Sequence, residues 1–439
     1  MTPPHHPRLG PRPLPLHLGL AAMRGWTALA TAGLAAAGPP DDAATGATPP
    51  PSSSSPGSPG WSGAWPRSSA ARREAGRIAR ALTAGGHRPE AFQAAVLRAL
   101  LRRDRALLEG IAAYRRHPFR RDLPDPPAVW RDGASRLLDY GAEGGGVPVL
   151  VVPSLVNRAH VLDLLPGADG SMLRFLAARG VRPLLLDWGW PGEAERRFTL
   201  TDAVAGRLEG ALGAARALAG GRPVALAGYC MGGLLALAAA LRRPGHVRAL
   251  ALLATPWDFW AGGEGAAHRA RALAGLLPAL EPVMEAAGGA LPVDAIQALF
   301  AALDPFAVAD KYRAFGRLDP ETPRARRFVA LEDWLNDGVP LPAPVAREAL
   351  AGWYGRNEPA RGLWRVAGRP VEPAAWAGPA FVAIPARDRI VPPASAAALA
   401  AALPRALVHR AAAGHIGMVA GNGAEAALWR PLLEWIRNA

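Results

Sequence analysis

Apolar strand segments alternate with helical segments between residues 136 and 253, and this alternation constrains the fold more than any other feature of the sequence. Residues 147–152 form an apolar run, as expected for a strand whose two faces are both covered. The alternation resumes after residue 378. The predicted strands are 136–140, 147–152, 183–188, 223–227, 247–253, 380–384 and 406–410. Strands separated by helices predict an α/β protein with a doubly wound, mostly parallel sheet.

A long insertion interrupts this alternation. Residues 257–377 contain helical pieces and aromatic-bearing loops, without clear strands. Inserted between two strands near their carboxyl ends, such a segment is typical of a cap over an active site. We therefore expect a first core part at 136–256, a helical cap at 257–377 and a second core part at 378–439.

The N-terminal part has a different composition. Residues 1–66 hold 14 of the 45 prolines, and residues 1–68 are predicted to be a disordered Pro/Ser/Gly-rich segment. A basic residue and an apolar run at 24–38 leave an export signal as the alternative. Residues 69–135 are predicted to be helical, with apolar residues at three- and four-residue spacings and arginines between them. This helix either packs on the main domain or binds a partner or granule surface.

The charge of the chain comes almost entirely from arginine. The net charge is +14, and Lys311 is the only lysine among 50 basic residues. No nucleic-acid-binding motif accompanies this charge, so an acidic small molecule such as a coenzyme A thioester is the better partner. The single cysteine excludes an intramolecular disulfide and fits a reducing cytoplasm. No stretch reaches the ~18 apolar residues of a transmembrane helix.

The motif Gly228-Tyr229-Cys230-Met231-Gly232-Gly233 carries the predicted chemistry. It follows an apolar strand and opens an apolar helix, which is the setting of a nucleophile elbow with Cys in place of Ser. The glycines allow close packing around the turn, and the helix N-terminus favours a thiolate at Cys230. The alternative is a buried structural cysteine in a turn.

A cysteine nucleophile needs a base, and the base needs a group that orients it. Asp388 follows the predicted strand at 380–384, and His415 follows the last strand at 406–410. The order Cys230, Asp388, His415 is that of the α/β-hydrolase fold. His409 lies inside a strand and is interpreted as structural.

An oxyanion hole needs backbone donors near the nucleophile. The Met231 N–H is one candidate, and the N–H of Leu155 or Val156 is the other, in the loop after the strand at 147–152. No ligand cluster has zinc or iron spacing, so neither a metal nor a cofactor is expected.

Several segments together resemble the polyhydroxyalkanoate (PHA) synthase family. They cover the oxyanion loop, the next strand and helix entry, the cysteine motif, the start of the insertion, and the acid and histidine loops: 153–158 with 162–164, 186–192 with 199–202, 228–233, 254–259, 388–392 and 414–416. The resemblance spans about residues 128–439. It implies that Cys230 takes a hydroxyacyl group from 3-hydroxyacyl-coenzyme A as a thioester, with His415 as the base. Asp388 then orients His415 or activates the 3-hydroxyl.

The resemblance also implies partners and a location. Coenzyme A enters as part of the substrate, and the expected partners are a second synthase subunit or a second copy, and the surface of a polyester granule. The expected location is the cytoplasm or that surface. Three alternatives remain: a dienelactone-hydrolase-like enzyme, a thioesterase or esterase, and a non-catalytic granule-associated protein. The 158 residues between Cys230 and Asp388 favour a capped enzyme over a compact lactone hydrolase.

Overall fold

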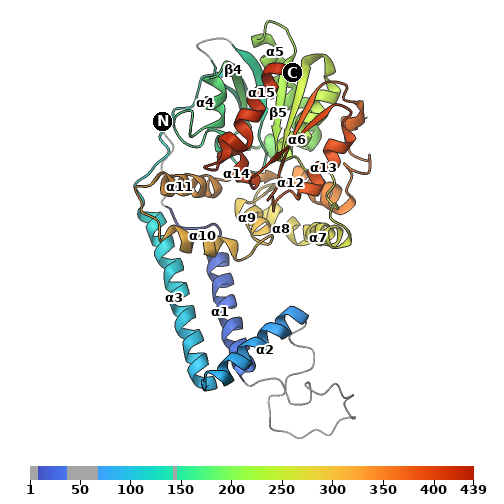
Figure 1. Ribbon diagram of the computed structural model, residues 1–439. Helices are drawn as coiled ribbons and strands as arrows, with labels where there is room; N and C mark the ends of the chain where they lie inside the picture. The colour runs from blue at the N-terminus through green and yellow to red at the C-terminus, as the bar shows by residue number, and fades with distance from the viewer. Residues whose placement is uncertain (1–7, 37–67, 142–145) are drawn as a thin grey trace, which may run out of the picture. The chain divides into compact units, whose positions relative to one another are not determined.

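The computed structural model describes residues 8–36, 68–141 and 146–439, which form two units. The larger unit comprises residues 117–304 and 318–439, and the smaller comprises residues up to 116 together with 305–317. Figure 1 shows the elements of each unit.

The larger unit is built on an eight-stranded sheet with the order β1-β2-β4-β3-β5-β6-β11-β12. In this sheet, β1 pairs with β2 and β2 pairs with β4 in the antiparallel sense, and all other neighbouring strands are parallel. The strands are β1 (Ala128–Asp132), β2 (Ser135–Asp139), β3 (Val147–Val152), β4 (Val181–Asp187), β5 (Val224–Tyr229), β6 (Val247–Leu253), β11 (Ala380–Pro385) and β12 (Ala406–Ala411). This confirms the predicted α/β-hydrolase fold class. The sheet begins at β1, inside the region expected to be helical.

Helices cover both faces of the sheet, which explains why its central strands are apolar throughout. Along β3, Leu150 and Val152 pack into one buried cluster, and Val149 and Val151 into the other, because successive side chains point to opposite faces. The first face carries α5 (Glu209–Leu218), α6 (Met231–Arg242) and α13 (Pro393–Ala402). The second carries α4 (Met172–Ala177), α14 (His415–Ala420) and α15 (Arg430–Asn438).

The insertion leaves the sheet after β6 and returns on β11, its hydrogen-bonded neighbour. It is mostly helical, as expected: α7 (Glu264–Ala274), α8 (Leu277–Ala286), α9 (Val293–Ala301), α10 (Ala307–Phe315), α11 (Pro323–Asn336), α12 (Ala343–Arg347) and the π-helix η6 (Glu348–Gly355). Four strands of two residues each add the pairs β7–β8 (Ala290–Leu291 with Leu341–Pro342) and β9–β10 (Arg365–Val366 with Arg369–Pro370). The sequence did not reveal that α10 belongs to the smaller unit.

The smaller unit consists of α1 (Leu14–Ala36), α2 (Ser69–Ala84), α3 (Pro89–Arg116) and α10. Tyr114 of α3 meets Tyr312 of α10 edge to face, with ring centroids 5.7 Å apart. Gly110 permits this approach, because a Cβ there would overlap with the backbone carbonyl of Tyr312.

The helix α1 corrects the expectation of disorder over residues 1–68. Prolines are frequent in this segment as a whole, but residues 16–36 contain none, and Pro15 lies in the first helical turn, where proline is tolerated. The apolar residues of α1 then have a surface to pack on, because α1 lies along α3. The remaining residues of the segment, 1–7 and 37–67, lie outside the described residues.

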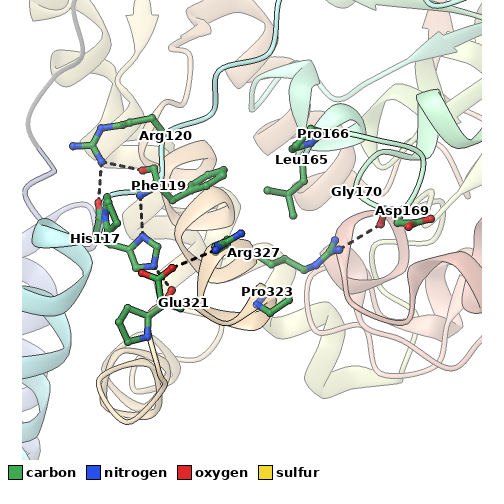
Figure 2. A pocket seen from close by; sticks show the side chains of 13 residues that line it. His117, Phe119, Arg120, Leu165, Pro166, Asp169, Gly170, Glu321, Pro323 and Arg327 are labelled. Carbon is green, nitrogen blue, oxygen red and sulfur yellow. Dashed lines mark hydrogen bonds and ion pairs between the residues drawn. The ribbon is translucent and has the colours of Figure 1, made fainter.

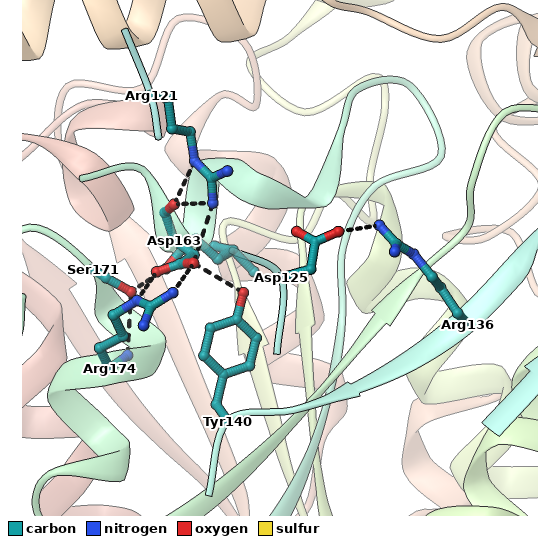
Figure 3. A network of polar contacts seen from close by, with 8 residues as sticks. Arg121, Asp125, Arg136, Tyr140, Asp163, Ser171 and Arg174 are labelled. Atoms are coloured by element: carbon teal, nitrogen blue, oxygen red, sulfur yellow. Dashed lines mark hydrogen bonds and ion pairs between the residues drawn. The ribbon is translucent and has the colours of Figure 1, made fainter. Parts of the chain in front are cut away.

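A buried carboxylate anchors the chain beyond β3. Asp163, the last residue of the short helix η2 (Ala159–Asp163), is fully buried. It accepts hydrogen bonds from Arg174 (2.8 and 3.0 Å), Arg121 (3.2 Å) and the Tyr140 hydroxyl (3.1 Å) (Figure 3). Burial and the charge of Asp163 raise the pKa of Tyr140, which keeps its hydroxyl a donor. The network ties η2 to β2, α4 and the segment before β1.

Substituting Asp163→Ala is expected to lower the free energy of unfolding of the larger unit by about 3–5 kcal/mol, because two partly buried guanidinium groups lose their counter-charge. Urea unfolding followed by tryptophan fluorescence measures the change. Asp122→Ala removes an equal charge from an exposed position and is the matched control. Equal stability of the two variants would contradict this role for Asp163.

Candidate active site

Cys230 occupies the turn between β5 and α6 with a left-handed backbone (φ 55°, ψ −127°), which is rare for a residue with a side chain. Its N–H donates to Leu253 O on β6 (2.8 Å), and its carbonyl accepts from Gly233 N–H (2.9 Å). The glycines of the motif are required by space. A Cβ at Gly228 would overlap with the backbone of Gly233, and one at Gly232 with the Val152 and Pro153 carbonyls. The strand, turn and helix are therefore those of a nucleophile elbow.

Asp388 and His415 meet at the same edge of the sheet, because β11 and β12 are parallel and end there. The His415 Nδ1 atom lies 2.7 Å from Asp388 Oδ2. The other oxygen of Asp388 accepts from the N–H groups of Ile390 (2.8 Å) and Val391 (2.9 Å). A carboxylate held in this way keeps the Nδ1 proton on His415, so Nε2 is the nitrogen available to Cys230.

His415 is buried and interacts with both Asp388 and Cys230. Burial on its own would lower the pKa of His415. The negative charge of a Cys230 thiolate, together with hydrogen bonds to Asp388 and Cys230, raises this pKa to about 10. The charged form of the His415 imidazole is therefore favoured electrostatically beside Cys230 and Asp388. Tyr229 also contacts His415. Its hydroxyl donates to the His415 carbonyl (3.3 Å), and the centroids of the two rings lie 5.2 Å apart.

The predicted oxyanion donors differ in whether their backbone N–H groups already have a hydrogen-bond partner. Met231 is the first residue of α6, where backbone N–H groups have no partner within the helix. The Val156 N–H already donates to Ser154 Oγ (3.2 Å), which leaves Leu155 as the better second candidate. The loop is fixed at both ends by indole N–H groups: Trp188 donates to Pro153 O (3.1 Å) and Trp334 to Arg158 O (2.7 Å).

The insertion contributes a residue that the sequence did not single out, Tyr354 of η6. Burial, and then the charge of Cys230, raise the pKa of Tyr354 to about 12, so the Tyr354 hydroxyl is within electrostatic range of Cys230. Its ring meets Phe259 edge to face at 4.8 Å. Phe259 in turn stacks on Trp353 (5.9 Å), and Trp353 meets Trp364 (5.3 Å). The only signal in the sequence was the density of aromatic residues in the insertion.

Other expectations can be checked against the described residues. His409 is structural, as predicted, because its Nε2 hydrogen-bonds to Ala427 O (2.7 Å) and its ring stacks on Phe381. Within the described ranges, no group of three or more His, Cys, Asp or Glu side chains is arranged to hold a metal ion. Nor is any helix there long and apolar enough to cross a membrane.

The elbow and the Asp388–His415 pair at the carboxyl edge of this sheet define the class of protein, an enzyme of the α/β-hydrolase fold. In agreement, a family model described as "alpha/beta hydrolase fold" matches residues 148–272. A solved α/β hydrolase fold protein from Nakamurella multipartita is 18% identical, with a TM-score of 0.42, and the match covers 69% of this chain and 95% of that one.

Curated relatives narrow the class. The chain is 28% identical over 314 residues to the poly(3-hydroxyalkanoate) polymerase subunit PhaC of Haloferax mediterranei, covering 70% of this chain and 62% of that one. It is 27% identical to the subunit of the same name from Synechocystis sp., covering 66% of this chain and 77% of that one. It is 26% identical to the subunit of the same name from Allochromatium vinosum, and that match covers 67% of this chain and 82% of that one. The chain is thus similar to poly(3-hydroxyalkanoate) polymerase subunits, as its motifs predicted, and it has the α/β-hydrolase fold.

Replacing Cys230 by Ala is expected to lower the pKa of His415 from about 10, because the thiolate charge and its hydrogen bond are lost while burial remains. The neutral imidazole should therefore be more populated in the variant than in the wild type at the same alkaline pH. A pH titration followed by nitrogen NMR of histidine-labelled protein, assigned with His415→Gln, measures this. The His409 signal is the internal control, and an unchanged pKa of His415 without Cys230 would contradict the pairing.

Proposed function

We propose that this protein transfers the hydroxyacyl group of a 3-hydroxyacyl-coenzyme A to Cys230 and polymerises such groups into a polyhydroxyalkanoate. The observation that carries the proposal is the Asp388–His415 pair, whose imidazole interacts with Cys230 on a nucleophile elbow. The similarity to poly(3-hydroxyalkanoate) polymerase subunits supports this substrate class. The net charge of +14 favours the approach of the polyanionic coenzyme A.

Acylation follows from the geometry. His415 Nε2 takes the proton of the Cys230 thiol, and the sulfur attacks the thioester carbonyl of the substrate. The N–H groups of Met231 and Leu155 stabilise the oxyanion of the tetrahedral intermediate. When the carbon–sulfur bond to coenzyme A breaks, the leaving thiolate takes the proton from the His415 imidazolium. Asp388 holds His415 in the required tautomer and stabilises its charge.

Chain growth uses the same groups with a hydroxyl as the nucleophile. His415 takes the proton of the 3-hydroxyl of one hydroxyacyl group, and the oxygen attacks the acyl group of another that is bound as a thioester. The new ester forms as the carbon–sulfur bond breaks, and the departing thiolate regains a proton from His415. Water competes for the same acyl group, so the chemistry depends on its exclusion. The aromatic residues Tyr354, Phe259 and Trp353 pack against one another, and in this proposal they form an apolar cover over the acyl group.

The partners and location follow from this chemistry. The proposed partners are a second synthase subunit or a second copy of the chain, and the surface of the growing polyester granule. The names of the relatives, which call them subunits, support the first of these. We place the protein in the cytoplasm or at the granule surface, in keeping with the free thiol of Cys230. Coenzyme A acts as part of the substrate, and the proposed chemistry needs no cofactor.

Cys230→Ala is expected to lower the rate of coenzyme A release from 3-hydroxybutyryl-coenzyme A by a factor on the order of 10³ or more, because no covalent intermediate can form. Cys230→Ser should recover little activity, since a hydroxyl needs far more activation than a thiol. A thiol-reactive dye measures the release. Circular dichroism and thermal melting control for folding. Unchanged turnover in folded Cys230→Ala protein would remove the nucleophile assignment.

The products of the same reaction separate the candidate functions. A synthase releases coenzyme A and forms insoluble polyester, whereas a thioesterase releases coenzyme A and leaves soluble 3-hydroxybutyrate. A lactone hydrolase or a non-catalytic protein does neither. Soluble hydroxy acid as the only product, with the chain alone and with a supplied synthase subunit, would exclude polymerisation and favour the thioesterase.

Tyr354→Ala is expected to roughly double the share of acyl groups released as soluble hydroxy acid, because the cover over Cys230 is opened to water. Chromatography of the soluble fraction, set against total coenzyme A release, measures this share. Leu363→Ala, at an exposed position of the same insertion, is the matched control. An unchanged share in Tyr354→Ala would show that other groups exclude water.

A further inference from the structure

A cavity of the larger unit, of about 570 Å³, has a lining that does not include Cys230. Three segments line it: residues 117–120, residues 165–170 and the chain from Pro320 into the first turns of α11 (Figure 2). Apolar side chains form much of its wall: Pro118, Phe119, Leu165, Pro166, Pro320 and Pro323. This volume suits a small organic molecule.

Three arginines line the same cavity, and two of them bind only backbone carbonyls among the described residues. Arg327 donates to Ala420 O (2.9 Å) and Asp169 O (3.5 Å), and Arg120 donates to His117 O (3.1 Å) and Phe119 O (3.0 Å). Arg326 pairs with Glu321 at 3.3 Å. A guanidinium has five N–H donors, so both Arg120 and Arg327 keep donors for a further acceptor.

Arg327 is the better placed of the two. It is half-buried, and burial lowers its pKa, whereas a neighbouring carboxylate would raise it. A partly desolvated guanidinium is stabilised by an oxyanion that accepts two parallel hydrogen bonds. We propose that this cavity binds a small organic anion, with a carboxylate or phosphate on Arg327 and an apolar body against Phe119 and the prolines.

The charge balance limits the ligand further. Asp169 and Glu321 also line the cavity, so its three arginines leave an excess of one positive charge. This excess fits a single oxyanion on a short apolar chain better than a polyphosphate. Short-chain carboxylic acids and alkyl monophosphates share this chemistry.

Arg327 also contacts the end of α14. The carbonyl to which it donates belongs to Ala420, the last residue of α14, and α14 begins at His415. A cation at a helix C-terminus stabilises the helix, so a change at Arg327 alone can alter folding or the histidine. Arg120 has no such contact and provides an independent variant.

The test is calorimetric titration of the full chain, with Cys230 first alkylated by iodoacetamide so that the proposed active site is blocked. The probes are butyrate, butyl phosphate, inorganic phosphate and butanol. Saturable binding is expected for butyrate or butyl phosphate, and whichever binds identifies the anion. Inorganic phosphate, which lacks the apolar body, and butanol, which lacks the anion, should bind at least ~10-fold more weakly.

Arg327→Gln and Arg120→Gln are each expected to weaken binding of the anion about 10-fold. Arg324→Gln removes the same charge from an exposed position of α11 that does not line the cavity, and it should bind as the wild type does. The proposal is overturned if no organic anion binds, if Arg120→Gln and Arg327→Gln both bind as Arg324→Gln does, or if butanol or inorganic phosphate binds equally well. Because Cys230 is blocked, the result is independent of the acyl-transfer assays.

Discussion

The left-handed backbone at Cys230 is the constraint on which the rest of the site depends. A residue with a Cβ in this region costs about 1–3 kcal/mol and persists only where its surroundings hold it. Here Cys230 N–H is hydrogen-bonded to β6, and the strand before it and the helix after it are almost fully buried. Ala254, which follows β6, is also left-handed (φ 48°). Two neighbouring strands therefore end in strained turns at the edge where the reactive groups meet.

The second constraint is electrostatic. His415 sits in surroundings that oppose its charge, yet its contacts with Cys230 and Asp388 outweigh the effect of burial. Asp388 is itself held by two backbone N–H groups, so the direction of the imidazole is set by the loop after β11 rather than by a flexible side chain. The site is thus organised in advance of substrate binding, which is the condition under which charge stabilisation is most effective.

The parts of the fold that were predictable are those with local signals. The positions of Cys230, Asp388 and His415 follow from strand ends, because parallel strands bring their carboxyl ends to one edge. The role of Tyr354 was not predictable, since a π-helix and long-range packing decide which aromatic residues of the insertion pack together. The helix α1 was missed because proline content was averaged over a segment whose prolines lie outside residues 16–36. The sequence also could not decide between Leu155 and Val156 as the second oxyanion donor. That choice depends on the Ser154 hydroxyl, which accepts a hydrogen bond from the Val156 N–H and whose direction no sequence pattern encodes.

The position at which the insertion joins the sheet has a consequence for how this architecture diversifies. Its two ends belong to β6 and β11, which are adjacent parallel strands, so the chain leaves at the carboxyl end of β6 and re-enters the sheet at the amino end of its neighbour. The entropy of closing such an excursion grows only with the logarithm of its length, by about 0.6 kcal/mol for each doubling. Large gains or losses of residues here therefore cost the sheet little. Evolution can therefore remodel the insertion while Cys230, Asp388 and His415, which follow strands of the sheet, stay in register.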